Sequence, residues 1–223
     1  MAMIKGLKQA FSLRALFLLL TVTTLNVVTD FGALREVAAD SPSRVNSCTG
    51  LDACLGSSAT IGDNSCNGIY ACQYSEGKIG NGSCNGEFRT CDASTGKIGN
   101  YSCNGYSACF QNSAHVGENS CNGVGTCSYT AGKIGEHSCN GGEGSCTFST
   151  IQVGDDSCNS PHYACAFSMG KIGDLSCNEY AACTNIDARI GDYSCNAIFG
   201  CFFSTVRIGD CLQNALQPAQ CAR

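Results

Sequence analysis

Hydrophobic and polar positions repeat along the chain with a period of 18 or 19 residues. An aliphatic residue followed by glycine opens each repeat, and a polar, turn-rich stretch follows it. These aliphatic residues are Ile61, Ile79, Ile98, Val116, Ile134, Val153, Ile172, Ile190 and Ile208. A fixed period of this length, with turn residues at the same place in each repeat, is typical of solenoid proteins. The pattern predicts an all-β protein, a parallel β-helix (β-solenoid), over residues 61–209.

Each repeat also carries two cysteines, separated by six residues or, in three repeats, by seven. The pairs are Cys48 and Cys54, Cys66 and Cys72, Cys84 and Cys91, Cys103 and Cys109, Cys121 and Cys127, Cys139 and Cys146, Cys158 and Cys165, Cys177 and Cys183, and Cys195 and Cys201. Cys211 and Cys221 form a last pair with a wider spacing. The additional residue always enters between the two cysteines, which predicts a turn there with strands on either side.

A repeat divides into three pieces of about six residues, such as IGDNSC, NGIYAC and QYSEGK in residues 61–78. This division resembles the hexapeptide repeat of left-handed β-helices, and the resemblance covers residues 61–209. It implies coils with three sides. The second and third pieces begin with Asn, Gln, Asp or Ser where that family has an aliphatic residue. The handedness therefore stays open, and no acyltransferase activity follows from the resemblance.

Two registers are open for the side chains of a coil. In the hexapeptide register Ser65 and Ala71 point inward with Ile61, which leaves the cysteines outside and makes a core of Ile, Ser and Ala. Burial of such a core stabilises the fold by less free energy than ordering the chain costs. In the alternative register the cysteines point inward, and strand alternation then turns an aromatic column inward as well. This column contains Tyr74, Tyr129, Phe148, Phe167 and Phe203. The larger core favours the second register.

Cysteines that point inward favour disulfides within a coil, such as Cys66–Cys72. Bonds between successive coils, such as Cys66–Cys84, are the alternative, because neighbouring strands lie only about 4.8 Å apart. The motif SCNGIYAC also resembles the staple of beetle-type antifreeze solenoids, whose coils likewise carry two cysteines six residues apart. The resemblance covers the staple alone. Those proteins present a Thr-x-Thr ladder to ice, and no column of this chain does so.

The N-terminal segment has the layout of a signal peptide. Lys5, Lys8 and Arg14 precede an apolar run at residues 15–20, and small residues at 37–39 suit a cleavage site. We expect a signal peptide, with a possible pro-segment, in residues 1–39, a degenerate first coil in 40–60, and a C-terminal cap in 210–223 pinned by Cys211–Cys221. The 20 cysteines indicate an oxidising compartment. The sequence thus predicts a secreted, extracellular protein that meets the membrane only through its signal segment.

Removing residues 1–39 takes away four Lys or Arg and two Asp or Glu, which leaves nine against sixteen and a net charge of −7. This charge argues against a nucleic-acid partner.

Cations close most repeats, and acids follow three residues later, for example Lys171 and Asp174. We expect these two columns to form a solvated ion-pair ladder. An acidic stripe that binds calcium or a mineral is the alternative. A column of asparagines from Asn67 to Asn196 is expected to stabilise the turns.

No catalytic or metal-binding constellation recurs. His115, His137 and His162 lie in three different columns, and the cysteine spacing differs from that of zinc sites. The sequence predicts no enzyme activity, no metal and no cofactor. Asn81 and Asn100 begin sequons for N-glycosylation. We expect a structural or surface-binding solenoid that presents a regular lattice to a polysaccharide, matrix, ice or mineral. A self-assembling coat or matrix component is the alternative, and a polysaccharide-active enzyme is less favoured.

Overall fold

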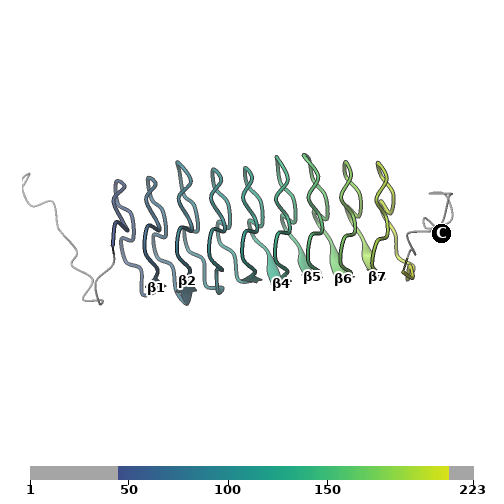
Figure 1. The fold of residues 1–223 in the computed structure, drawn as a ribbon, viewed down its shortest axis with the longest axis horizontal. Helices are drawn as coiled ribbons and strands as arrows, with labels where there is room; N and C mark the ends of the chain where they lie inside the picture. The colour runs from purple at the N-terminus through teal and green to yellow at the C-terminus, as the bar shows by residue number, and fades with distance from the viewer. Residues whose placement is uncertain (1–44, 211–223) are drawn as a thin grey trace, which may run out of the picture. The chain divides into compact units, whose positions relative to one another are not determined.

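The computed structural model describes residues 45–210, which form a stack of coils with short strands and no helix. The strands are β1 (Thr60–Ile61), β2 (Lys78–Ile79), β3 (His115–Val116), β4 (Ala131–Ile134), β5 (Thr150–Val153), β6 (Met169–Ile172) and β7 (Asp187–Ile190). β1 pairs in parallel with β2, and β3 to β7 pair in parallel with one another in chain order. The chain therefore folds as the predicted parallel β-solenoid, with coils of about 18 residues (Figure 1).

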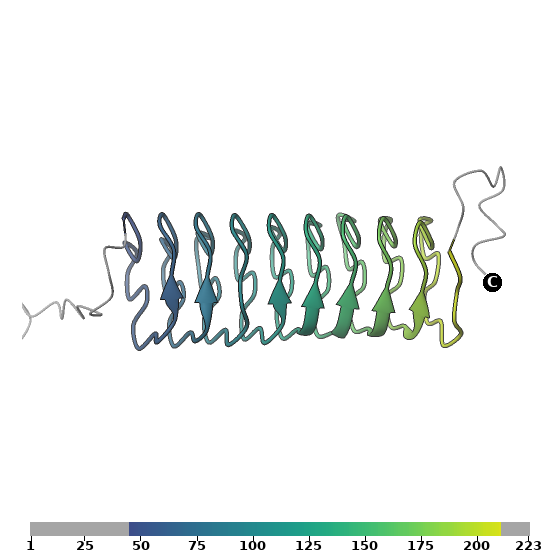
Figure 2. The same cartoon turned by 60° about the horizontal axis from the view of Figure 1, so that its bottom comes forward.

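All seven strands lie on one side of the stack and run in the same direction (Figure 2). They form a two-stranded sheet of β1 and β2 and a five-stranded sheet from β3 to β7. Isolated bridges at Ile98 connect these sheets, and a bridge from Ile190 to Ile208 continues the ladder. The aliphatic residue of each repeat ends its strand and faces inward. The side chain before it faces solvent, as strand alternation requires.

Apart from single bridges such as that between Ile69 and Phe88, the remainder of each coil consists of tight turns, so the strands predicted on both sides of the cysteine turn are wrong for residues 45–210. In the coil that contains Cys66, backbone φ is positive at Asn64, Cys66, Tyr70, Cys72 and Tyr74. This left-handed conformation is uncommon for residues other than glycine. The turns remain bonded to their neighbours, since the Cys72 N–H donates to the Thr90 carbonyl at 2.9 Å and the Tyr74 N–H to the Leu55 carbonyl at 2.9 Å.

Nine disulfides, each within one coil, cross the interior of residues 45–210. The structure thus has the intra-coil pairing, with Cα–Cα distances between 5.5 and 5.9 Å. The first of them, Cys48–Cys54, lies in the segment expected to be a degenerate first coil. This segment stacks on the next coil through the Cys54 N–H and the Ala71 carbonyl, at 2.8 Å. Cys211 and Cys221, the predicted signal peptide and the body of the predicted cap lie outside the described residues.

The core contains the aliphatic column, the disulfides and a column of buried serines, so each of the two registers is partly wrong. Cys66 is buried, as the second register requires, but Ser65 and Ala71 are buried too. The aromatic column that this register turns inward is exposed instead, with Tyr74 at 58% and Phe203 at 64%. The alternation rule fails here because left-handed turns, rather than a strand, join Cys72 to Tyr74.

Hydrogen bonds explain why a core with so many serines is stable. The Ser120 hydroxyl donates to the Gly135 carbonyl at 2.7 Å and accepts the Ser138 N–H at 3.1 Å. Ser65, Ser83, Ser102, Ser138, Ser157 and Ser176 make the same two contacts with the coil that follows each. A buried hydroxyl is costly only when it lacks partners. The serine column therefore links every coil to the next at little desolvation cost.

Candidate functional site: a cationic row on the strand face

The residue before each aliphatic position forms a line on the strand face, which we call the cationic row. Its members are Lys78, Lys97, His115, Lys133, Lys171, Arg189 and Arg207, together with the uncharged Thr60 and Gln152. All nine side chains are exposed. Strand pairing holds them in register, for example Lys133 opposite Gln152, Gln152 opposite Lys171, and Lys171 opposite Arg189. Parallel strands are about 4.8 Å apart, so this distance also separates successive members of the row.

The expected ion-pair ladder between this row and the acidic column is wrong for the described residues. The only ion pair shown in residues 45–210 joins Arg89 to Asp92, at 3.5 Å, away from the row. The acids bond to backbone instead, because the Asp155 Oδ1 accepts the Glu136 N–H at 2.8 Å and the Asp174 Oδ1 accepts the Asp155 N–H at 2.9 Å. Asparagine can accept the same bond. This explains why Asn81 and Asn100 can replace an acid in that column.

The glycine that follows each aliphatic residue opens a shallow groove between the row and the acidic column. One depression of about 260 Å³ is lined by the cationic side chains Lys171, Arg189 and Arg207 and by the acidic side chains Asp192 and Asp210. A similar one of about 290 Å³ lies between Lys97 and Glu118, with His115 at its edge. The glycines themselves are explained by packing, since a Cβ at Gly99 would lie 2.6 Å from the backbone of Gly117.

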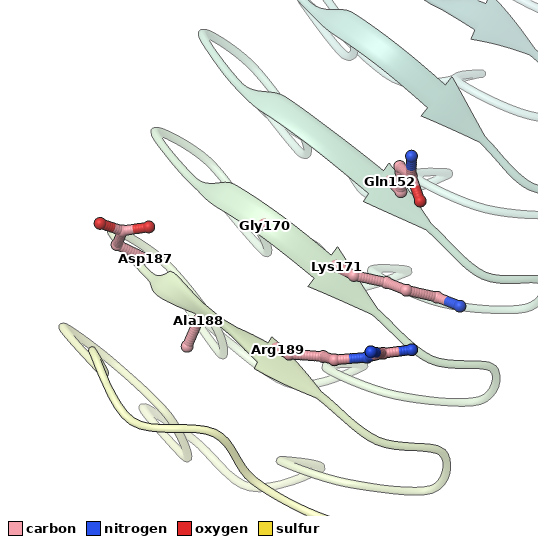
Figure 3. Close-up of a pocket in the computed structure, with 6 residues that line it drawn as sticks. All are labelled: Gln152, Gly170, Lys171, Asp187, Ala188 and Arg189. Carbon is pink, nitrogen blue, oxygen red and sulfur yellow. The ribbon is translucent and has the colours of Figure 1, made fainter.

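A third depression, of about 510 Å³, lies on the strand face itself. It is lined by Gln152, Gly170, Lys171, Asp187, Ala188 and Arg189 (Figure 3). In this view the Lys171 and Arg189 side chains point the same way along their strands, while Asp187 lies at the opposite end of its strand. Two cationic groups therefore converge on one side of an open, shallow surface. Such a surface suits an elongated ligand better than a small molecule, which usually requires a concave pocket.

His115 reports the electrostatic field of the row. Partial burial lowers the pKa of its imidazole below the ordinary value of 6.5, and the charges of Lys97 and Lys133 lower it further. Elsewhere, burial raises the pKa of Asp92, and the nearby Arg89 guanidinium partly offsets this.

We expect the double substitution Lys97→Gln and Lys133→Gln to raise the pKa of His115, because it removes both neighbouring charges. The lowered pKa means that the unfolded chain binds the proton more tightly. The contribution of His115 to stability is therefore complete above about pH 6.5 and is lost as the pH falls through the folded pKa. NMR titration of the imidazole protons measures this pKa. Lys171→Gln, at a distant position of the row, is the control, and an equal rise in that variant would contradict the assignment.

The turns that carry the disulfides present a second regular feature, an exposed aromatic strip. It contains Phe110, Tyr129, Phe148 and Phe167. The rings of Tyr129 and Phe148 are parallel, with centroids 4.7 Å apart, and those of Phe148 and Phe167 are parallel at 5.4 Å. Phe148 is therefore stacked on both faces, by Tyr129 on one side and by Phe167 on the other. A sugar ring stacks on an aromatic face, so this strip is a poor platform for carbohydrate.

The asparagine column serves the turns, as expected from the sequence. The Asn85 side chain donates to the Asn64 carbonyl at 2.7 Å and accepts the Asn67 N–H at 3.1 Å. Asn104, Asn122, Asn140, Asn159 and Asn178 repeat this pattern. The contacts are to backbone rather than to other asparagine side chains. A residue with both a donor and an acceptor is therefore needed at this position.

The two sequons lie in the acidic column. The Asn81 Oδ1 accepts the Asp63 N–H at 2.9 Å, while the Asn100 Nδ2 donates to the Glu118 Oε1 at 2.9 Å. Asn81 is exposed and Asn100 is half-buried. A glycan is attached through Nδ2, so at Asn100 it would replace a contact that the folded chain makes. Modification at either position remains a prediction.

The three histidines lie in three different environments. His115 lies in the cationic row, the Nε2 of His137 lies 3.5 Å from the Asn119 Nδ2, and His162 packs edge-on against Tyr180. Every cysteine from Cys48 to Cys201 is bonded in a disulfide. Close groups of three sulfurs such as Cys72, Cys84 and Cys91 therefore lack the thiolates that metal coordination requires.

Sequence reasoning missed the cationic row as a separate surface. The available signal was the distribution of positive charge, since residues 45–210 contain seven Lys and Arg and six of them occupy this one column. Arg89 is the seventh. Pairing each cation with the acid three residues later hid this signal.

Fold and surface together define a class, a disulfide-stapled parallel β-solenoid from an oxidising environment. The chain belongs to the family described as a domain of unknown function (DUF7640), whose model matches residues 46–163 and 127–222. No curated protein and no solved structure matches the chain significantly. None of the described residues forms a helix long and apolar enough to cross a membrane.

Proposed function

We propose that this chain is a secreted, non-enzymatic solenoid that presents a regular lattice of side chains to an extended extracellular partner. The observation that carries the proposal is the strict register of the strand face, where exposed side chains recur once per coil from Thr60 to Arg207. A row with a constant spacing can make the same contact many times with a repetitive partner, and the individual contacts then act together. Polysaccharide, matrix, mineral and ice surfaces all have such repeats.

Rigidity supports the same proposal. A disulfide constrains each coil, and hydrogen bonds from the serine, asparagine and aspartate columns connect it to the next one. A surface that is ordered before binding loses little conformational entropy when the partner docks. Among the candidate partners, ice is the least favoured, because the row contains Lys and Arg rather than an array of threonines. Secretion itself is supported by the signal-like segment and the nine disulfides.

The experiment that tests the proposal is co-sedimentation of the mature, oxidised protein with insoluble polysaccharide fibres and with a mineral powder, compared with the reduced protein. We expect the oxidised protein to sediment with at least one of these surfaces, and the reduced protein to lose this binding. Analytical ultracentrifugation without a partner tests the alternative. Concentration-dependent growth into large assemblies, with no binding to any surface, would favour a self-assembling coat or matrix component instead.

A further inference from the structure

The cationic row has a cost that the fold alone does not explain. Like charges directly opposite each other on neighbouring strands destabilise a sheet. Lys171 faces Arg189 in this way, and Lys97 and Lys133 flank His115. No described carboxylate forms an ion pair with the row. Thr60 and Gln152 show that uncharged residues also fit the position. A local conflict of this kind, without a packing reason, is typical of a functional surface.

We propose that the cationic row binds a linear anionic polysaccharide, with about one carboxylate or sulfate per sugar, which lies along the stack of coils. This inference rests on the proposed function and names the class of partner. An extended pyranose residue is close in length to the spacing of the row, about 4.8 Å. Consecutive anionic groups can therefore meet consecutive members of the row. The three depressions beside Lys97, Lys171 and Arg189 leave room for the sugar rings.

The acidic column beside the groove restricts how a polyanion can lie. Asp155, Asp174 and Asp192 each use one carboxylate oxygen on the backbone of the preceding coil, so these groups hold a fixed place beside the row. Their charge repels an anionic chain that departs from the row. A single line of cations bounded by acids therefore favours a narrow, linear polymer and disfavours a broad anionic surface.

The same geometry disfavours nucleic acid. A duplex carries one charge per about 1.7 Å of its axis, which a single row with one cation per coil matches poorly. Single strands bind through aromatic side chains on which bases stack, placed along a basic groove. The outward-facing column next to the row on the strand face contains Ala131, Thr150, Met169 and Asp187, and none of these is aromatic. The aromatic strip belongs to the turns with the disulfides.

Gln152→Lys tests the inference by filling the uncharged gap between Lys133 and Lys171. The probes are polygalacturonate for the carboxylate and dextran sulfate for the sulfate, with uncharged dextran as the neutral control. We expect the substitution to tighten binding to at least one polyanion by about fivefold. Val124→Lys is the matched control, since it adds the same charge at an exposed position on the disulfide side. This control should change the affinity by less than about twofold.

Removal of charge supplies the opposite arm. The triple substitution Lys171→Gln, Arg189→Gln and Arg207→Gln should weaken polyanion binding about a hundredfold. These side chains are exposed, and the variant should melt no lower than the wild type at low salt, because repulsion between the cations is relieved.

The pKa of His115 provides a local readout of binding. Lys97 and Lys133 lie on either side of His115 in the row, and Lys78, Glu118 and Glu136 line the same depression. Bound polyanion should raise the pKa of His115 and leave the ring resonances of His162 unchanged.

The outcomes separate this inference from the proposed function. An equal gain from Gln152→Lys and Val124→Lys, tighter binding of an oligothymidylate than of either polyanion, or an unchanged His115 pKa on binding would overturn the polysaccharide assignment. Sedimentation with neutral fibres, combined with no affinity for polyanions, would overturn it and leave the proposed function in place. Failure to bind any surface or polymer would remove both.

Discussion

Complete reduction of the disulfides is expected to abolish the cooperative thermal transition of the protein. Closing a loop of about seven residues contributes about 2 kcal/mol in the chain-entropy estimate. Nine such loops lie in residues 45–210, against a typical total stability of about 5–15 kcal/mol for a domain. The sulfurs also fill the interior of each coil, with Cys121 and Cys127 fully buried. Neither the aliphatic column nor the serines can replace this apolar volume.

Circular dichroism during heating, with and without a phosphine reductant, measures this effect. Removal of a single disulfide should have a smaller effect. We expect Cys121→Ser and Cys127→Ser together to lower the unfolding free energy by about 2 kcal/mol or more. The same substitutions at Cys48 and Cys54 form the control, because these cysteines are only half-buried in the first described coil. A reduced protein that still melts cooperatively near the original temperature would show that the aliphatic column and the hydrogen bonds hold the coils together without the disulfides.

Gly99→Ala is expected to destabilise the middle of the stack strongly. The added Cβ would lie 2.6 Å from the carbonyl carbon and oxygen of Gly117 and 2.8 Å from the Glu118 nitrogen. These atoms belong to the backbone of the next coil and cannot rotate away. Overpacking of this kind costs about 1–3 kcal/mol, and here we expect the upper end or more. The spacing between coils must increase locally, which also weakens the hydrogen bond between the Gly99 N–H and the Val116 carbonyl.

Thermal unfolding checks this prediction, and we expect a fall in the melting temperature on the order of 10 °C. Gly209→Ala is the matched control, because this glycine occupies the same column and no described atom lies within 4 Å of its added Cβ. Equal melting temperatures for the Gly99 and Gly209 variants would mean that close contact between coils does not require the glycine column.

The comparison of the two cysteine registers shows how far local rules extend in this chain. Burial of Cys66 followed from the need for an apolar interior, and the structure agrees. The inward placement of Tyr74 followed from strand alternation, and this failed because positive φ angles at Cys72 and Tyr74 replace the strand by turns. Residues other than glycine in that conformation give no sequence signal. The disulfide and the hydrogen bonds to both neighbouring coils stabilise it, and these exist only after the coils have stacked.

The candidate site divides in the same way. The repeat period alone predicts that Lys97, His115 and Lys133 lie in one column. Whether their charges are neutralised depends on where the acids point, which the period does not reveal. Asp155 and its equivalents accept a backbone N–H from the preceding coil, because the tight corner leaves that group without another partner.

The sequence by itself therefore determined the solenoid, its coil of 18 to 19 residues and the alignment of the cysteines in two columns. A repeated pattern places equivalent residues at equivalent positions of each coil. Only the tertiary structure decided which columns face inward, that serine belongs to the core, and that no described carboxylate forms an ion pair with the row of cations. Those outcomes depend on left-handed turns and on hydrogen bonds between residues 15 to 22 positions apart, such as Ser120 with Gly135 and Asn159 with His137. Contacts of that kind form only when one coil lies on the next.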